Sequence, residues 1–250
     1  MNQAVHAASA PRPNPAADLR SGSLAEFAVT RESLGVFQAG TPPTSYFVIK
    51  RLIDITGAAF GLLLFSPVLL MVALLIGRDA GLPIFHRRRV LEKQKYRDGI
   101  APLTFDAFKF RTMVPNADVV LRADPELLRE YQKTFKLLND PRVTRVGHHL
   151  RRLSIDELPQ LLNVLRGQMS LVGPRMISPP ELMMYGSHAE TLLSVKPGLT
   201  GLWQVSGRTN VGYAERVRLD MWYIKNRSPS TDFEILVRTV GSVLGRKGAV

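Results

Sequence analysis

The chain has 250 residues, of which 45% are hydrophobic, and its 33 Lys and Arg against 21 Asp and Glu give a formal net charge of +12. Its length and apolar content suffice for one large domain or two small ones. The absence of cysteine excludes a disulfide framework and any zinc site built on Cys. The positive charge predicts an anionic partner, whether a lipid headgroup, a nucleic acid or a phosphorylated small molecule.

Residues 1–44 are rich in Ala, Pro and Ser and show no sustained periodicity. This composition predicts a disordered polar leader. The first twenty residues have no apolar core behind a positive start, so the pattern of a secretory signal peptide is not met.

The stretch Ile55–Ile76 is uncharged and apolar throughout. As a continuous helix it would reach ~33 Å, which is enough to cross a hydrocarbon core of ~30 Å. Pro67 has no N–H, and its ring clashes with the carbonyl of Leu63, so we expect a bend or break at Ser66–Pro67. Two shapes remain open for residues 45–80, a kinked transmembrane span and a re-entrant hairpin.

Basic residues flank this apolar stretch on both sides. Lys50 and Arg51 precede it, and Arg78 and the run His86–Arg89 follow it. Lys and Arg prefer the cytoplasmic side of a membrane. A hairpin leaves both flanks on that side, whereas a straight span sends one of them across.

Two strands are predicted after the membrane segment. Ile84–Phe85 and the basic run behind them form a short strand, and Leu103–Met113 alternates apolar and polar residues. The alternation places Lys109 and Arg111 on one face. Two such cations can hold phosphate oxygens, although a solvated edge strand has the same pattern.

Residues 115–140 are expected to form a charged helical excursion, with Pro125 at a helix start. An amphipathic cover and a subunit contact are the two interpretations of this excursion, and the second leaves a homodimer open. The chain should close with helices over Tyr213–Lys225 and Phe233–Leu244, the latter packed on the core or lying on the membrane. The predicted class is α+β, mostly helical with a small sheet.

A helix is predicted from Asp156 to Leu165, because Leu158, Leu161 and Leu165 recur at helical spacing. Ser154 matches a capping box, but Pro159 would then forfeit a helical hydrogen bond, so Asp156 is the alternative cap.

Acids in the first turn of a helix are ordinarily only stabilising, and this interpretation applies to Asp156 and Glu157. The functional alternative starts from the same position. A carboxylate at a helix start near several arginines is kept ionised, which suits Asp156 as a nucleophile toward phosphorus. Glu157 could hold Mg²⁺, which binds one or two carboxylates together with substrate phosphates.

Further along, Pro174–Arg175 forms a tight turn, and residues 196–208 form a glycine-punctuated loop containing Trp203 and Arg208. The indole could stack on a nucleobase, although a Trp in a membrane protein more often lies in the interfacial belt.

Several of these stretches occur together and in order. They are Lys50-Arg-Leu-Ile-Asp54, Ser66-Pro67, Lys109-Phe-Arg111, Leu153-Ser-Ile-Asp156-Glu157-Leu-Pro-Gln160, Leu-Val-Gly-Pro174-Arg175, Lys196-Pro-Gly-Leu-Thr-Gly201, Gly207-Arg208 and Leu219-Asp220-Met-Trp-Tyr. From about Tyr46 to Arg246 the chain resembles the bacterial sugar transferases, the monotopic phosphoglycosyl transferases that load galactose or glucose 1-phosphate onto undecaprenyl phosphate.

The resemblance implies a monotopic membrane protein with a Ser66-Pro67 hairpin break, interfacial amphipathic helices, and a catalytic domain over residues 81–250. It also implies location on the cytoplasmic face of the bacterial inner membrane. Its partners would be a UDP-sugar, undecaprenyl phosphate and membrane lipid, and not nucleic acid. The product would initiate exopolysaccharide, capsule or O-antigen synthesis. Since many relatives carry an N-terminal multi-helix membrane domain, the short leader suggests a minimal catalytic unit.

The resemblance also implies residue roles. Asp156 would attack the β-phosphate of the UDP-sugar, release UMP and carry the phosphosugar to the lipid, while Glu157 would bind Mg²⁺. The substrate-binding residues would be Lys109, Arg111, Arg152, Pro174, Arg175, Arg208 and Asp220. One departure is Met176, because the family's nucleotide loop usually has Pro at this position.

Two functions of other classes compete with the transferase. A membrane-tethered basic protein could bind nucleic acid or anionic lipid through its net charge alone. A polytopic assembly subunit could use the apolar segment as an ordinary span. The grouping of cations around Asp156 and Glu157 disfavours nucleic acid, because acids in a phosphate-binding groove repel it.

Overall fold

The structure is a computed structural model that describes residues 42–94, 102–134, 137, 139–207 and 212–244. Apart from its last three positions, the predicted polar leader lies outside the described residues. The predicted site residue Arg208 also lies outside them.

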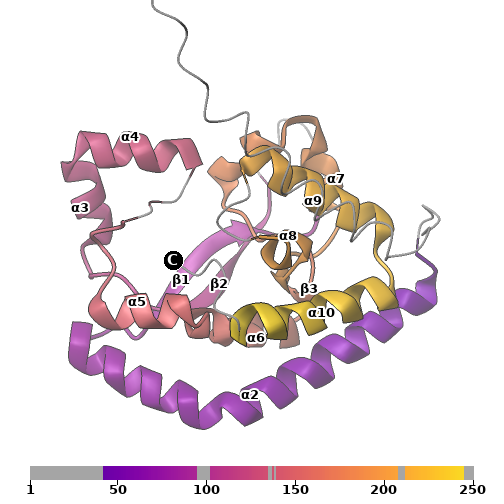
Figure 1. The fold of residues 1–250 in the computed structure, drawn as a ribbon, viewed down its shortest axis with the longest axis horizontal. Helices are drawn as coiled ribbons and strands as arrows, with labels where there is room; N and C mark the ends of the chain where they lie inside the picture. Colours follow the sequence, from indigo (N-terminus) through magenta and orange to yellow (C-terminus); the bar gives the residue numbers. More distant parts are fainter. Residues whose placement is uncertain (1–41, 95–101, 135–136, 138, 208–211, 245–250) are drawn as a thin grey trace, which may run out of the picture. The chain divides into compact units, whose positions relative to one another are not determined.

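The described part is mostly helical with two small sheets, as the α+β prediction requires (Figure 1). In chain order its elements are α2 (Thr44–Ala80), β1 (Phe85–Leu91), β2 (Thr104–Phe110), α3 (Ala117–Ala123), α4 (Pro125–Thr134), α5 (Arg145–Arg152), η1 (Ile155–Gln160), α6 (Leu161–Leu165), β3 (Ser170–Val172), η2 (Pro179–His188), α7 (Ala189–Leu193), β4 (Gly198–Thr200), α8 (Leu202–Val205), α9 (Tyr213–Asn226) and α10 (Pro229–Leu244). β1 and β2 pair antiparallel, and β3 and β4 pair in parallel. The predicted strands, the helical excursion and the two closing helices are confirmed.

α2 is helical without interruption from Thr44 to Ala80, and Figure 1 shows it bent near its middle. The carbonyl of Leu63 has no N–H partner four residues on, because Pro67 occupies that position. The Ser66 hydroxyl donates to this carbonyl at 2.8 Å. The side chain thus satisfies the oxygen that proline leaves unpaired, and α2 bends at the Ser-Pro step without breaking there.

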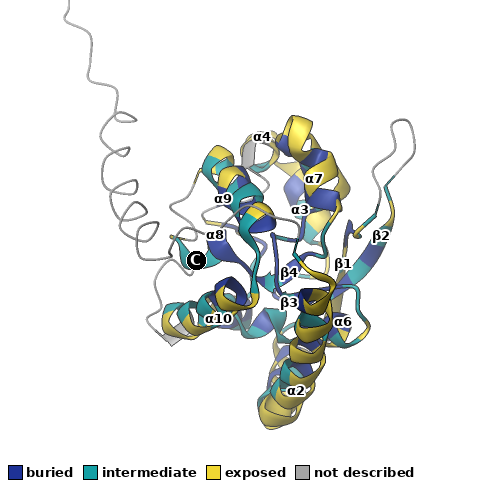
Figure 2. Cartoon of the chain, turned by 90° about the vertical axis from the view of Figure 1, so that its right-hand side faces the viewer, coloured by how far each residue is buried: buried dark blue, intermediate teal, exposed yellow. Residues whose placement is uncertain are grey.

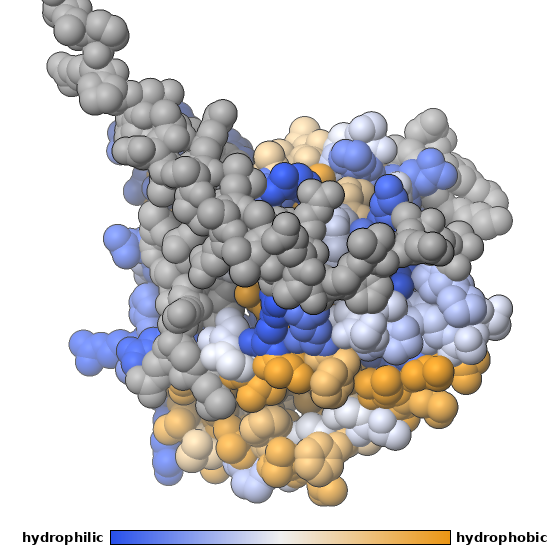
Figure 3. Space-filling view, turned by 45° about the vertical axis from the view of Figure 1, so that its right-hand side comes forward, coloured by the Kyte–Doolittle hydropathy of each residue, from blue (hydrophilic) through white to orange (hydrophobic). Residues whose placement is uncertain are grey.

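Most of the apolar surface of α2 is exposed. Only 11% of its most apolar 18-residue window is buried, and the helix is long and apolar enough to cross a membrane. In Figure 2 most of α2 is coloured as exposed, and Figure 3 shows an apolar band with hydrophilic residues directly above it. The large exposed side chains of α2 are Phe47, Val48, Ile49, Leu52, Ile53, Ile55, Phe60, Leu63, Leu64, Phe65, Leu70, Met71, Leu74 and Leu75. A soluble protein rarely leaves so large a contiguous apolar patch in water.

Both ends of α2 are attached to the rest of the described chain. Near its start, Lys50 donates to Asp232 of α10 at 2.8 Å and Tyr46 donates to the same carboxylate at 3.0 Å. At its end, the guanidinium of Arg111 donates to the carbonyls of Ala80, at 2.6 Å, and Gly81. A cation at the carbonyl end of a helix is favoured by the helix dipole.

The two arms of α2 pack into two separate cores. Ala58 of the first arm lies in a cluster with Val90, Phe105, Ala107, Leu161, Val164, Met169 and Met176. Val72 and Ile76 of the second arm pack with Phe110 and Leu150. The short helix η1 joins these cores, because Leu158 packs on the first and Ile155 on the second.

The helix predicted from Asp156 to Leu165 is wrong in its first half. Residues Ile155–Gln160 form the 3₁₀ helix η1, and α-helical geometry begins only at Leu161. Ser154 is left-handed, with φ 55°, and its side chain makes no cap hydrogen bond. A 3₁₀ turn tolerates Pro159, which an α-helix starting at Ser154 would not, since proline lacks the N–H and crowds the preceding turn. The predicted end is confirmed, with Gly167 at φ 79°.

The role of Ser66 is tested by Ser66→Ala, with Thr56→Ala as the matched control. Thr56 donates to the Leu52 carbonyl at 2.8 Å, but that carbonyl keeps its normal helical donor. We expect Ser66→Ala to destabilise the protein by about 1 kcal/mol and Thr56→Ala by clearly less, because only the first leaves a carbonyl unpaired. Thermal unfolding in detergent measures both, and equal losses would contradict the role.

Candidate active site

Asp156 and Glu157 lie together on η1 against the Lys109 side chain of β2. The ammonium of Lys109 donates to Glu157 Oε1 at 2.6 Å and lies 3.7 Å from Asp156 Oδ2. Asp156 is buried, whereas the Glu157 side chain keeps 31% of its surface exposed. One ammonium therefore joins a buried and a partly exposed carboxylate.

The pKa values of the two acids are shifted in opposite directions. Burial raises the pKa of Asp156, and the charge of Lys109 opposes this shift. Burial also acts to raise the pKa of Glu157, but the charge and hydrogen bond of Lys109 outweigh it and leave that pKa lowered. The sequence does not show this burial, which acts against the ionised form of Asp156, whereas the charges of Lys109 and Arg151 favour that form. Glu157 is the carboxylate whose charge the site favours.

Three arginines add positive charge around the pair. Arg151 acts electrostatically on both acids and donates to Thr112 Oγ1 at 2.9 Å. The charges of Arg175 and Arg88 contribute to the lowered pKa of Glu157. The site therefore concentrates four cations, with Lys109, near two carboxylates.

Arg111 and Arg152, which are predicted to hold phosphates, lie elsewhere. Arg111 is buried at the end of α2, where its Nε and Nη1 make no hydrogen bond within the described residues. Arg152 lies at the end of α5 and is exposed. The structure thus brings Lys109 to the acid pair and does not bring these two arginines to it.

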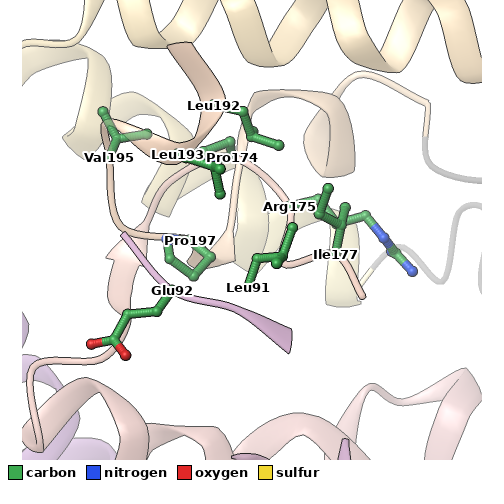
Figure 4. A pocket seen from close by; sticks show the side chains of 9 residues that line it. All are labelled: Leu91, Glu92, Pro174, Arg175, Ile177, Leu192, Leu193, Val195 and Pro197. Atoms are coloured by element: carbon green, nitrogen blue, oxygen red, sulfur yellow. The ribbon is translucent and has the colours of Figure 1, made fainter. Parts of the chain in front are cut away.

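Pro174 and Arg175 follow β3 in a segment held from several sides. The Pro174 carbonyl accepts from the amide of Gly198 at 2.8 Å. Met176, where the family pattern has proline, lies in the first core, so side-chain burial holds this segment in place of a second ring. Figure 4 shows an apolar depression beside it, from which the Arg175 guanidinium points away. It is lined by Leu91, Glu92, Pro174, Arg175, Ile177, Leu192, Leu193, Val195 and Pro197.

Asp220 of α9 is fully buried and accepts a hydrogen bond from Tyr185 at 2.8 Å. Burial raises its pKa to about 7, against the hydrogen bond of Tyr185 and the charge of Arg175. Asp220 has no exposed surface and accepts a hydrogen bond from the backbone of Arg175. It therefore supports the Arg175 segment from inside the protein. Contact with substrate, the predicted role, would require this region to open.

Trp203 is 6% exposed, so the expected place in a membrane-interfacial belt is wrong. The guanidinium carbons of Arg216 and Arg175 lie 4.4 and 5.0 Å from the centre of its ring. Such contacts are favourable between a cation and an aromatic face. The indole thereby helps to fix Arg175.

The donor set at the acid pair suits Mg²⁺. No cluster of three or more His, Cys, Asp or Glu side chains occurs in the part of the chain that the structure describes. Mg²⁺ needs none, because it takes one or two carboxylates and fills its octahedron with water and substrate phosphate. The partly exposed Glu157, of lowered pKa, meets that requirement.

Comparison with known proteins identifies the family of the chain. The family model described as bacterial sugar transferase matches residues 45–246. The chain belongs to the bacterial sugar transferase family. Among its relatives in the family, the UDP-galactose-lipid carrier transferase of Erwinia amylovora is 47% identical, over 80% of this chain and 41% of that protein.

Two further relatives have similar identity. The undecaprenyl-phosphate galactose phosphotransferase of Salmonella typhimurium is 44% identical, over 80% of this chain and 41% of that protein. The exopolysaccharide production protein ExoY of Rhizobium meliloti is 45% identical, over 80% of this chain and 87% of that protein. The chain thus spans about two fifths of the first two relatives and most of the third. Family membership does not favour the alternative of a basic binding protein.

The sequence does not single out Arg151 or Arg88. In the sequence Arg151 is only one of several nearby cations, and the family resemblance points to its neighbour Arg152. Arg88 belongs to a basic run that lipid headgroups suffice to explain. A signal exists for Arg88, since strand alternation puts it on the face of His86, which pairs with Lys109 across the sheet.

The central cation is tested by Lys109→Met, with Arg89→Met as control. We expect Lys109→Met to destabilise the protein by roughly 3 kcal/mol at pH 7, because it leaves two carboxylates without their partner. Arg89 pairs with Asp106 at 3.2 Å in an exposed position, so its loss should cost little.

The pH dependence of this difference provides a second check. Lys109 lowers the pKa of Glu157, so its stabilisation is present above the ordinary pKa of Glu and is lost as the pH falls through the lowered one. Thermal unfolding from pH 7 to well below the ordinary Glu pKa of about 4.3 should therefore show the wild type and Lys109→Met converging. A difference independent of pH would contradict the electrostatic account.

Proposed function

We propose that this chain transfers a sugar 1-phosphate from a UDP-sugar to undecaprenyl phosphate through a phosphosugar bound to Asp156. The contact of Lys109 with the buried Asp156, beside Glu157, carries the proposal. The names of the relatives from Erwinia amylovora and Salmonella typhimurium, which specify lipid carriers and undecaprenyl phosphate, support it. We propose that the product initiates exopolysaccharide, capsule or O-antigen synthesis.

The proposed reaction has two displacements at one phosphorus. A carboxylate oxygen of Asp156 bonds to the phosphorus that carries the sugar, and the bond from that phosphorus to the bridging oxygen breaks, so UMP leaves with the electron pair. An oxygen of undecaprenyl phosphate then attacks the same phosphorus. The bond to Asp156 breaks, its electron pair returns to the carboxylate, and a sugar diphosphate lipid is formed.

The residues of the site divide the work of positioning and charge neutralisation. Lys109 lies close enough to favour the ionised form of Asp156 against its burial. Arg151 and Arg175 add positive charge where non-bridging phosphate oxygens would carry negative charge. Glu157 would hold Mg²⁺, which supplies further neutralisation of the diphosphate when bound.

We further propose that α2 is re-entrant and that the catalytic residues lie at the cytoplasmic face of the inner membrane. Both ends of α2 are bonded to the same body, through Asp232 and through Arg111. A straight span would have to release one of these attachments. The exposed apolar stripe of α10, formed by Phe233, Val237 and Val240, would lie on the same membrane surface. The basic flanks of α2 favour the cytoplasmic side.

The role of Asp156 is tested by Asp156→Asn, with Asp106→Asn as control. Asp106 lies on β2 in an exposed ion pair, so its loss should leave turnover nearly unchanged. We expect Asp156→Asn to lower UMP release from UDP-hexoses by at least about 10³-fold, since an amide is not a nucleophile of this kind. Turnover near the wild-type rate in Asp156→Asn would exclude it as the nucleophile.

The membrane arrangement is tested by single cysteines, which the cysteine-free chain permits. Ser45→Cys and Arg89→Cys introduce thiols at exposed positions on opposite flanks of α2. A membrane-impermeant maleimide should label both from the cytoplasmic side in inverted vesicles and neither in right-side-out cells. Labelling of the two positions from opposite sides would show a span and defeat the hairpin.

A further inference from the structure

A cation from the first arm of α2 and a cation from the loop between α7 and β4 lie together at Gly167, away from the acid pair. Arg51 of α2 donates to the carbonyls of Val164 and Leu165 at 2.7 and 2.8 Å. A Cβ built on Gly167 would lie 3.5 Å from Arg51 Nη2 and 3.6 Å from the ammonium of Lys196. The missing side chain therefore leaves a space that two cationic nitrogens face.

The acidic residues nearby do not fully neutralise the positive charges of Arg51 and Lys196. The Lys196 ammonium makes no hydrogen bond or ion pair with any described residue, and neither Arg51 nor Lys196 forms an ion pair with Asp156 or Glu157. Asp54 and Glu92 act on Lys196 only at a distance, and Asp54 Oδ1 already accepts from Ser170 and the amide of Leu171. Partial burial of two like charges is unfavourable unless an anion joins them.

The pKa of Lys196 agrees with this imbalance. Partial burial lowers it, and the charge of Arg51 lowers it further. An anion bound between the two groups would reverse the second effect and favour the charged form of the lysine.

The position of the pair along α2 indicates the source of such an anion. Arg51 is the last basic residue before the apolar stretch, and the neighbouring Val48, Leu52 and Ile55 are exposed. From Arg51 to Pro67 the helix extends about 24 Å, whereas half of a hydrocarbon core is about 15 Å. In the proposed membrane placement, with the first arm tilted, Arg51 therefore reaches the level of the lipid phosphates.

We propose that Arg51, Lys196 and the open face of Gly167 bind the phosphate of an anionic phospholipid in the same leaflet as α2. This inference rests on the membrane placement proposed above. The acyl chains would lie along the exposed side chains around Leu52. Glycine is required at position 167 for two reasons. Its φ of 79° disfavours other residues, and the absence of a side chain leaves space for the phosphate. The bound lipid would help to fix the depth of the catalytic body.

The test counts lipids that remain on the full chain. The protein is reconstituted in nanodiscs of phosphatidylcholine and phosphatidylglycerol, released, and analysed by native mass spectrometry without any UDP-sugar. We expect the wild type to retain phosphatidylglycerol over phosphatidylcholine by roughly fivefold for each cation engaged. Lys196→Gln should reduce this preference about fivefold, whereas Lys225→Gln, which removes an exposed charge of α9, should leave it unchanged.

A second variant keeps the result independent of the loss of lysine. Gly167→Asp places a carboxylate between the two cations, and Asp is among the residues that best tolerate positive φ. It should abolish the preference for phosphatidylglycerol. The same preference in the wild type, Lys196→Gln and Gly167→Asp would overturn the proposal.

Inorganic phosphate separates a lipid site from a free-anion site. Retention of phosphatidylglycerol in millimolar phosphate supports a lipid ligand, and complete displacement overturns it in favour of a soluble anion. No readout involves turnover, so failure here leaves the transferase proposal untouched. Failure of the transferase, tested by Asp156→Asn, would likewise leave the lipid count unchanged.

Discussion

The apolar surface of α2 is the constraint on which the rest of the structure depends. The helix exposes far more large apolar side chains than it buries, yet each of its arms contributes residues to a core of the body. Removing each exposed side chain from water is worth about 1.5–3 kcal/mol. Because Lys50 and Arg111 fasten the two ends to one body, a membrane that takes up the apolar face also fixes where the catalytic residues lie.

This constraint reaches the acid pair through η1. Ile155 packs into the core of the second arm and Leu158 into that of the first, so Asp156 and Glu157 lie on the segment that joins both. The segment is a 3₁₀ helix, a geometry that tolerates Pro159. In it Asp156 is buried and Glu157 is partly exposed. In the proposed mechanism Lys109 separates their roles, with Asp156 as the nucleophile and Glu157 as the ligand of a cation. The arms of α2 thus hold the chemistry in place as well as anchoring the chain.

The sequence predicted what depends on local pattern and missed what depends on tertiary packing. Alternation found β2, periodicity found α9 and α10, and the Ser66-Pro67 pair predicted a bend, though not the hydroxyl that keeps α2 continuous. The burial of Asp156 and Asp220 was invisible, because it comes from distant segments. The electrostatic action of Arg151 on both acids was invisible for the same reason, since it depends on how α5 packs against η1. The residue roles rest on family resemblance, because spacing and periodicity alone do not distinguish a catalytic acid from a stabilising one.

The claim that Asp156 is the nucleophile is tested most directly by the mass of the intact protein. The chain in nanodiscs is incubated with a UDP-hexose and Mg²⁺ but without undecaprenyl phosphate. The reaction is quenched in acid, and the mass of the intact protein is measured by mass spectrometry. The account predicts an added hexose phosphate on the wild type, located at Asp156 by fragmentation, which disappears when undecaprenyl phosphate is supplied. UMP release with no adduct on the protein, or an adduct on another residue, would contradict it.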